Sequence, residues 1–227
     1  MTYDKILKEN KQKTSNKQFT VIIRNRNEER YIGFSIQSVL DHLKDPEILI
    51  IDNNSTDRSI EIAKSFNFAN ITICRINDYT PGDAINMGVN NATCENLLIL
   101  SAHSQIVKLS DENVINNLNH YGAVFGRQIP IWNGRKINPR YIWSHFIQKD
   151  VTNMFSSIEG RYFLHNAFSF FKKEILLEHP FDRTLYGKED RYWANDRVNN
   201  GFNIFYDHNS ICHHHFTNEG ATWRGIG

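Results

Sequence analysis

The sequence lacks the features that mark several large classes of protein. Its three cysteines, Cys74, Cys94 and Cys212, are an odd number without metal-type spacing, which favours free thiols in a reducing compartment over a disulfide framework. The N-terminus has no apolar signal region, and no run approaches the roughly 20 apolar residues of a membrane span. The net charge of +1 gives no footprint for nucleic acid. We therefore expect a soluble, cytoplasmic protein without a nucleic-acid partner.

The two ends of the sequence differ from its middle. Residues 1–18 are polar and rich in lysine. They fit either a solvated tail or a weak tether to the inner face of the cytoplasmic membrane, where each basic residue adds about 1 kcal/mol. The last residues, 223–227, offer no evident closing element, as in a piece of a longer protein. With no repeats and no Pro/Gly-rich linker, residues 19–227 are expected to form a single domain with halves 19–104 and 105–227.

The first half alternates short β-branched runs with segments of helical period, which predicts strands and helices in turn. Such alternation with short connections implies right-handed crossovers and an α/β fold, with a mostly parallel central sheet flanked by helices. The expected strands are residues 19–24, 47–52, 71–74 and 96–100, with helices over 30–43, 60–66 and 81–89.

Beyond residue 104 the alternation is lost. A long aromatic, irregular stretch covers residues 132–163. Around it, strands are expected over residues 122–126, 167–171 and 202–206, and helices over 111–118 and 189–199.

Polar residues follow three of the expected parallel strands: Arg24–Asn27, Asp52–Asn54 and Ser101–His103. Ligands of such sheets bind beyond the carboxyl ends of the strands. The sequence therefore predicts one crevice that these three segments share.

Four segments, in order along the chain, resemble motifs of glycosyltransferase family 2. They are the opening strand with its Asn-Glu loop, the Asp-containing turn, an Asn-x-Gly and a Glu-Asp pair, at residues 21–29, 50–57, 86–88 and 188–194. The resemblance covers residues 19–216 and implies a GT-A (Rossmann-like) fold and an inverting mechanism. Residues 1–18 would then be a tail, 19–104 the nucleotide-sugar half and 105–227 the acceptor half.

One subgroup of this family is more similar still. It has Ser-Ala-His in place of the metal-binding Asp-x-Asp, followed by Gly-Arg-Gln-x-Pro; here these are residues 101–103 and 126–130. Its members are often labelled rhamnosyltransferases of bacterial surface polysaccharides.

The resemblance implies roles for the Glu-Asp pair. Asp190 would be the general base that takes the proton of the attacking acceptor hydroxyl, with Glu189 orienting Asp190 or the acceptor. Without the resemblance, both residues are also explained as acidic side chains that complement the positive end of a helix dipole.

Because Asp-x-Asp is absent, the role of a divalent metal (Mn or Mg) is open. If residues 212–215 form a strand, His213 and His215 point to one side of it and would form an imidazole site with His103. Alternatively no metal binds, and His103 or Arg127 contacts the donor phosphates directly. A third interpretation of the histidine run is a hydrogen-bonded strand end.

The resemblance also implies donor and acceptor sites. An Asn at position 53, where the family often has Asp, weakens the prediction of uridine, so the donor is expected to be a dTDP- or UDP-sugar first, with a CMP-sugar compatible. The acceptor would be a glycan or lipid-linked glycan. Candidate donor residues are Arg24, Arg26, Glu28, Asp52, Asn53, Ser101, Ala102, His103 and Arg127, and candidate acceptor residues are Trp132, His165, Asn166 and Trp193.

These features lead to an expected function and its alternatives. The leading hypothesis is an inverting glycosyltransferase that extends a bacterial surface glycan, either capsule or lipopolysaccharide. The second is a non-catalytic sugar-binding or scaffold module that has lost the metal aspartates. A nucleotidyltransferase fits poorly, because residues 24–29 contain no glycine for a phosphate loop.

Overall fold

The computed structural model describes residues 18–137, 141–218, 220, 222 and 223. Apart from Gln18, the lysine-rich tail lies outside the described residues. Within the described part of the chain, no helix is long and apolar enough to cross a membrane.

The N-terminal half forms the parallel part of the sheet, as the alternation predicts. Four strands lie in the order β3-β2-β1-β4 and all pair in parallel. Their bounds are β1 (Phe19–Asn25), β2 (Glu47–Asp52), β3 (Ile71–Arg75) and β4 (Asn96–Ser101), and the connecting helices are α2 (Ile32–His42), α3 (Ser59–Ser65) and α4 (Pro81–Asn91).

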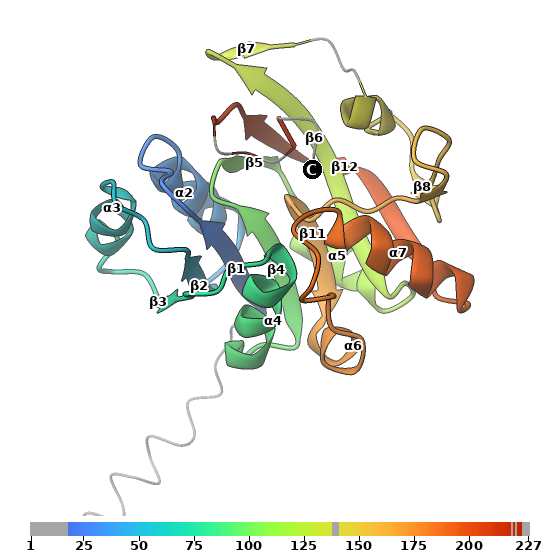
Figure 1. Cartoon of the computed structure of the whole chain (residues 1–227), viewed down its shortest axis with the longest axis horizontal. Coiled ribbons are helices and arrows are strands. Elements are labelled where there is room, and N and C mark those ends of the chain that lie inside the picture. The colour runs from blue at the N-terminus through green and yellow to red at the C-terminus, as the bar shows by residue number, and fades with distance from the viewer. Residues whose placement is uncertain (1–17, 138–140, 219, 221, 224–227) are drawn as a thin grey trace, which may run out of the picture.

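The C-terminal half extends the same sheet beyond β4 in the order β11-β6-β12-β5 (Figure 1). Here β11 runs antiparallel to both neighbours, β6 and β12 are parallel, and β5 is antiparallel to β12. The strands are β5 (Ser104–Lys108), β6 (Ala123–Trp132), β11 (Phe168–Lys172) and β12 (Ile204–His215), and the helices are α5 (Asp111–Leu118), α6 (Lys173–Glu178) and α7 (Glu189–Asn199).

The aromatic stretch between β6 and β11 is less irregular than its sequence indicates. Its described residues form four two-residue strands and one 3₁₀ helix: β7 (Arg135–Lys136), η1 (Tyr141–His145), β8 (Val151–Thr152), β9 (Phe155–Ser156) and β10 (Arg161–Tyr162). The hairpin of β9 and β10 lies against α7, which brings this segment next to the Glu-Asp pair.

Both faces of the sheet are buried, which explains why its strands are almost continuously apolar. Successive residues of β1 enter opposite hydrophobic clusters: Ile22 faces α4 and α7, whereas Val21 and Ile23 face α2. The close approach of α4 depends on Gly88, since a Cβ there would lie 2.5 Å from Cγ2 of Ile22. This packing fixes where β1 and β4 end, and therefore where the predicted crevice lies.

Candidate functional site

A cleft of about 240 Å³ lies where the sequence predicts it, beyond the carboxyl ends of β1 and β4 and against the start of α7. The residues that line it are Arg24, Asn25, Arg26, Glu28, Asn53, Tyr79, Pro81, Ser101, His103, His165, Tyr186, Gly187, Lys188, Glu189, Asp190, Arg191, Gly220 and Thr222. It therefore combines both halves of the chain, with carboxylates, cations and imidazoles on one surface.

Asp190 is held at the first turn of α7 by two backbone donors. Its Oδ2 accepts the N–H of Asn166 at 2.9 Å, and its Oδ1 accepts the N–H of Arg191 at 2.9 Å. Burial alone would raise the pKa of this carboxyl, but the nearby charge of Arg191 and the bond from Asn166 hold the pKa below its usual range. Asp190 is thus a buried carboxylate that stays ionised, which is the state a general base needs.

Glu189, its neighbour, has the opposite electrostatic environment. Burial, and next the charge of Asp190, raise the pKa of Glu189, while Arg24 opposes the shift. The guanidinium of Arg24 pairs with Oε1 of Glu189 at 3.1 Å. Environments that separate the pKa values of two adjacent carboxyls suit different chemical roles, because one carboxyl stays ionised and the other is protonated more readily.

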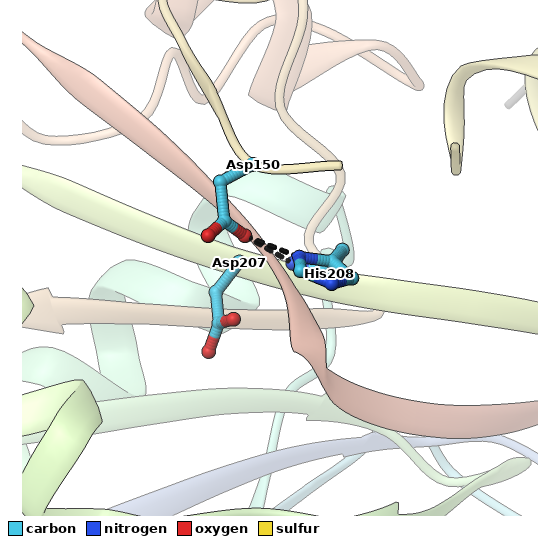
Figure 2. Close-up of side chains that lie close together, drawn as sticks. All are labelled: Asp150, Asp207 and His208. Atoms are coloured by element: carbon cyan, nitrogen blue, oxygen red, sulfur yellow. Dashed lines mark hydrogen bonds and ion pairs between the residues drawn. The ribbon is translucent and has the colours of Figure 1, made fainter. Parts of the chain in front are cut away.

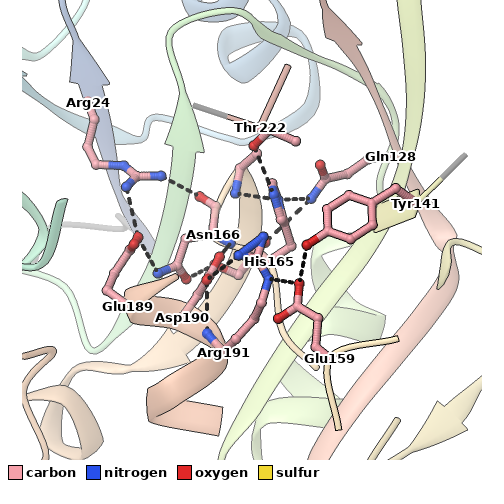
Figure 3. Close-up of polar contacts among 12 residues, drawn as sticks. Arg24, Gln128, Tyr141, Glu159, His165, Asn166, Glu189, Asp190, Arg191 and Thr222 are labelled. Atoms are coloured by element: carbon pink, nitrogen blue, oxygen red, sulfur yellow. Dashed lines mark hydrogen bonds and ion pairs between the residues drawn. The ribbon is translucent and has the colours of Figure 1, made fainter. Parts of the chain in front are cut away.

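Asn166 joins the two carboxylates and Arg24 (Figure 3). Its backbone N–H donates to Asp190, its side-chain amide lies 3.5 Å from Oε1 of Glu189, and its carbonyl oxygen lies 3.4 Å from Arg24. The side chain is fully buried and is not part of the cleft lining. In this structure Asn166 therefore supports the carboxylates and is not open to an acceptor.

A chain of hydrogen bonds connects Glu28, His103, His214, Gln128 and His165. Nδ1 of His103 lies 2.9 Å from Oε1 of Glu28, and its Nε2 lies 3.0 Å from Nε2 of His214. Nδ1 of His214 lies 2.9 Å from Oε1 of Gln128, whose Nε2 lies 3.0 Å from Nδ1 of His165. Burial lowers the pKa of His165 to about 3 and lowers that of His214 well below its usual value, so both rings are neutral at pH 7.

The grouping of His103 with His213 and His215 is wrong in its geometry. β12 presents His214 to His103, whereas His215 points away, stacks on Tyr31 and lies 3.3 Å from Gln105. Because side chains alternate along a strand, His213 lies on the side of His215. Burial, followed by the charge of His213, lowers the pKa of His215 to about 4.

The candidate donor residues divide into two groups. Arg24, Arg26, Glu28, Asn53, Ser101 and His103 line the cleft, whereas Asp52, Ala102 and Arg127 do not. Asp52 is buried and fixes the turn after β2 by accepting bonds from Asn25 and Ser55, and the N–H of Ala102 donates to the carbonyl of Arg24. The charge of Arg127 lies near Tyr206, since its neighbour Gln128 takes the position that faces the site.

The candidate acceptor residues also divide. His165 lines the cleft, but neither tryptophan does. Trp193 is 6% exposed, packs on Phe171 and Phe181, and donates its indole N–H to His179. Trp132 is exposed at the end of β6. The prediction that Trp193 contacts the acceptor is therefore wrong, because its ring faces are covered by the core.

Sequence reasoning missed several residues of the site: Tyr79, Gln128, Tyr186, Lys188, Arg191, His214 and Thr222. Gln128 lies inside the Gly-Arg-Gln-x-Pro segment and Arg191 follows the Glu-Asp pair, so both carried a signal. Arg191 is fully buried, lies 3.4 Å from Glu159 and 3.6 Å from Asp190, and its guanidinium nitrogens make no hydrogen bond within the described residues.

A second polar cluster lies away from the cleft, where the register of β12 shifts against β6 (Figure 2). Among the described residues, only Asp150, Asp207 and His208 form a group of three possible metal ligands within 4.8 Å of one another. The backbone and Nδ1 of His208 bond Oδ1 of Asp150, and Asp207 accepts bonds from Asn209 and Ser210. These hydrogen bonds explain why the three side chains lie together, as part of the irregularity in β12.

The fold and the position of the cleft define the class of the protein. The structure is similar to that of TarS residues 1–349 of S. aureus in complex with UDP-GlcNAc, with TM-score 0.69, 20% identity, and 89% of this chain aligned to 60% of that one. It is also similar to GalNAc-T7 with UDP, GalNAc and Mn²⁺, with TM-score 0.67, 14% identity, and 91% of this chain aligned to 45% of that one. The chain thus has the GT-A fold and spans only about half the length of these structures.

The sequence identifies the family. The profile of glycosyl transferase family 2 matches residues 20–179, so the chain belongs to this family. No curated protein matched it in sequence.

Proposed function

We propose that this domain transfers a sugar from a nucleotide-sugar donor to a hydroxyl of an acceptor glycan, with inversion and with Asp190 as the general base. The observation that carries the proposal is the ionised, backbone-held carboxylate of Asp190 in a cleft at the carboxyl ends of β1 and β4. Ligands of open α/β sheets bind at this edge, so a donor there would place its anomeric carbon near α7.

The proposed reaction is a single displacement. The acceptor oxygen attacks the anomeric carbon, its proton passes to Asp190, and the bond between that carbon and the donor phosphate breaks. Negative charge then develops on the leaving nucleotide, where cations stabilise it. Arg24, Arg26 and Lys188 line the cleft and supply such charge, and a divalent ion (Mn or Mg) is part of the proposal.

The proposed donor is a UDP- or dTDP-sugar first, with a CMP-sugar as the alternative. TarS was crystallised with UDP-GlcNAc and with UDP, which supports a uridine donor for a chain of the same fold. Asn53 lines the cleft with an amide that both donates and accepts, so it matches the imide face of uracil or thymine as well as N3 of cytosine.

The proposed acceptor is a growing bacterial surface glycan, of capsule or lipopolysaccharide, extended at the inner face of the cytoplasmic membrane. The support is the family's Ser-Ala-His subgroup resemblance and the lysine-rich residues 1–18. A non-catalytic sugar-binding module is the second candidate, and the replacement of Asp-x-Asp by Ser101, Ala102 and His103 favours it.

A thermal-shift screen tests donor binding. UDP, dTDP, GDP and CMP are each added with Mn²⁺, with Mg²⁺ or with EDTA, since a ligand of the folded state raises the melting temperature. We expect a shift with UDP or dTDP. Absence of a shift with every nucleotide contradicts the proposal.

Donor hydrolysis then separates the two candidates. Turnover of the corresponding nucleotide sugar that disappears in Asp190→Asn supports an enzyme. Nucleotide or sugar binding without any turnover supports the non-catalytic module.

A further inference from the structure

Arg191 is a buried cation whose burial is not explained by packing. Its side chain is 1% exposed, and its Nε, Nη1 and Nη2 have no hydrogen-bond partner within the described part of the chain. A buried charge is costly unless it is paired and hydrogen-bonded, and an apolar side chain of similar volume often stabilises a fold as well or better. The position of this guanidinium therefore indicates a role in the chemistry of the site.

Two carboxylates share the charge of Arg191 (Figure 3). Its Nε lies 3.4 Å from Oε1 of Glu159, and its Nη1 lies 3.6 Å from Oδ1 of Asp190. Both are ion-pair distances, longer than the about 2.7–3.2 Å of an N–H···O hydrogen bond, so neither carboxylate binds the guanidinium exclusively. The carboxylate side chains are 5% and 7% exposed. With so little water between them, the three charges act on one another with weak screening.

Glu159 comes from the aromatic stretch and not from the strands that form the cleft. It lies in the turn between β9 and β10, and the packing of β10 on α7 brings it to Arg191. The hydroxyl of Tyr141 donates to Oε1 of Glu159 at 3.2 Å, whereas Oε2 has no hydrogen-bond partner within the described residues. Arg191 is the only cation that pairs with this carboxylate in the part of the chain that the structure describes.

Proton transfer changes the balance of these charges. When Asp190 takes the proton of the attacking hydroxyl, its carboxylate becomes a neutral acid and no longer balances Arg191. Without a second carboxylate, the transfer would leave a buried guanidinium unpaired, which is strongly unfavourable. With Glu159 present, Arg191 keeps a counter-ion after the transfer. Glu159 therefore stabilises the protonated form of Asp190.

We propose that Glu159 is a positioning residue for the reaction, which shares the charge of Arg191 with Asp190 so that Asp190 can take the acceptor proton. The inference rests on the proposed function and deepens it, since it names a residue that acts on the proposed base through another side chain. Glu159 is not part of the cleft lining, and the side chain of Arg191 is almost fully covered. Neither residue needs to touch the substrate.

The other groups that face Asp190 do not replace Glu159. Arg24, on β1, pairs with Glu189 at 3.1 Å, so each of these charges has its own partner. The ring of His165 is neutral, because burial lowers its pKa to about 3. Arg191 is thus the cation near Asp190 that lacks a partner of its own once Asp190 is protonated, unless Glu159 is present.

The groups on the far side of Glu159 are also accounted for. Burial lowers the pKa of His145, so its ring is neutral at pH 7. The guanidinium of Arg161 lies 4.4 Å from the ring centre of Tyr192, and its Nε donates to the carbonyl oxygen of Glu159, not to the carboxylate. The carboxylate of Glu159 therefore remains available to Arg191.

The test observes the carboxyl of Asp190 directly and needs no substrate. In the full chain labelled with ¹³C at the aspartate carboxyls, the Cγ signal of Asp190 is identified by its loss in Asp190→Asn and followed against pH. Glu159→Gln should lower the pKa of Asp190 by about 0.5–1 unit, because Arg191 then has no other partner. Arg191→Met should raise it by about 1–3 units, because a neighbouring cation is lost.

Two controls match these substitutions. Glu178→Gln changes a carboxylate whose side chain is 77% exposed, and Arg197→Met changes another guanidinium of α7, one that pairs with Asp196. Neither should move the titration of Asp190. In the Arg191→Met background, Glu159→Gln should add little, because the effect of Glu159 passes through the guanidinium.

Turnover gives a second readout. The nucleotide sugar whose nucleotide raises the melting temperature is hydrolysed at a series of pH values, since kcat/KM reports the base of the free enzyme. Glu159→Gln should lower kcat severalfold and move the acid limb to lower pH, whereas Arg191→Lys, which keeps the charge, should leave the limb near that of the wild type. A purely structural loss would lower kcat and leave the limb in place.

Each variant decides on its own, which covers the case in which the other does not fold. An unchanged pKa of Asp190 in Glu159→Gln, or a pKa that does not rise in Arg191→Met, overturns the inference. If the pKa is unchanged and Glu159→Gln hydrolyses a nucleotide sugar as the wild type does, the inference fails and the proposed function stands. If the pKa shifts as expected but no nucleotide sugar is turned over, the charge sharing is confirmed and the proposed function fails.

Discussion

The backbone N–H of Asn166 donates a 2.9 Å hydrogen bond to Oδ2 of Asp190, across 24 residues of sequence. The donor lies just before β11 and the acceptor opens α7, so the position of the carboxylate is set by the sheet as well as by its own helix. A backbone donor cannot be removed by side-chain substitution, which makes this anchor compatible with isosteric changes at position 190.

Asp190→Asn should therefore abolish transfer without unfolding the site. The amide keeps an oxygen for the N–H of Asn166 but cannot take the acceptor proton, and loss of a positioned base costs roughly 10²–10⁴-fold in kcat. The melting-temperature shift caused by the donor nucleotide should remain. Asp196→Asn, an exposed change on the same helix, is the control and should retain kcat. Full activity of Asp190→Asn would refute its role as the base.

Arg24→Met should destabilise the fold as well as weaken donor binding. It leaves the buried Glu189 without its 3.1 Å cation next to Asp190, and breaking a buried pair costs about 3–5 kcal/mol. Urea unfolding measures the loss, and the double variant with Glu189→Gln should recover part of it. Arg58→Met removes an exposed pair with Glu61 and should leave the free energy of unfolding nearly unchanged. Equal losses for the two arginines would contradict this account.

Substitutions of Trp193 and Trp132 should differ in their effect on stability, because Trp193 is buried and Trp132 is exposed. Trp193→Ala should cost about 3–5 kcal/mol of unfolding free energy, because its ring packs on Phe171 and Phe181 in the core. Trp132→Ala, at a position that is 51% exposed, should stay within about 0.5 kcal/mol. Chemical unfolding of both variants checks the difference, and a stable Trp193→Ala would show that its ring is not a core element.

Gly82→Ala tests how α4 positions the segment before α7. A Cβ at Gly82 would lie 2.4 Å from the backbone oxygen of Asp182, which cannot move as a side chain would. We expect a loss of about 1–3 kcal/mol and a lower kcat, since the displaced segment leads to Tyr186 and Lys188 in the cleft. Gly33→Ala, whose Cβ would meet only the flexible Ile62 side chain at 3.3 Å, is the control. Similar unfolding curves for both variants would argue against this clash.

The parallel half of the fold can be predicted from the sequence because the patterns that specify its strands and helices are local. Each strand there is a short run of mostly apolar residues, and each crossover is a helix of regular period, so order and direction need no distant contact. β5 and most of β12 were missed because their pairing joins residues about 100 positions apart, such as Ser104 and His214. A polar strand whose partners are this distant has no local hydrophobic pattern to reveal it.

Within the site, the sequence predicts which segments lie at the cleft but not which of their side chains face it. Carboxyl ends of parallel strands meet at one edge, which is why Arg24, Ser101 and His103 all line the cleft. The choice of Arg127 instead of Gln128, and of His213 and His215 instead of His214, was wrong because side chains alternate along a strand. Which member of a pair faces inward depends on register, and the register of β12 shifts between Asp207 and Ile211.

Stability should fall as the pH drops below that of a neutral solution, and His165 is one cause. Burial lowers the pKa of His165 to about 3, against an unfolded value near 6.5. Between these two pKa values His165 binds a proton in the unfolded chain but not in the folded chain. The stability contributed by the neutral ring is therefore present above about pH 6.5 and is lost progressively toward pH 3, at a limiting slope of about 1.4 kcal/mol per pH unit.

His165→Gln isolates this contribution, because a glutamine does not titrate. Its free energy of unfolding, from urea titrations in EDTA at pH 7.5, 6.5 and 5.5, should decline less steeply than that of the wild type by up to about 1 kcal/mol per pH unit below 6.5. His120→Gln, at an exposed position of the same chain, is the control and should follow the wild-type slope. Parallel curves for His165→Gln and the wild type would mean that His165 binds its proton equally in the folded and unfolded chains, which would contradict the lowered pKa of the buried ring.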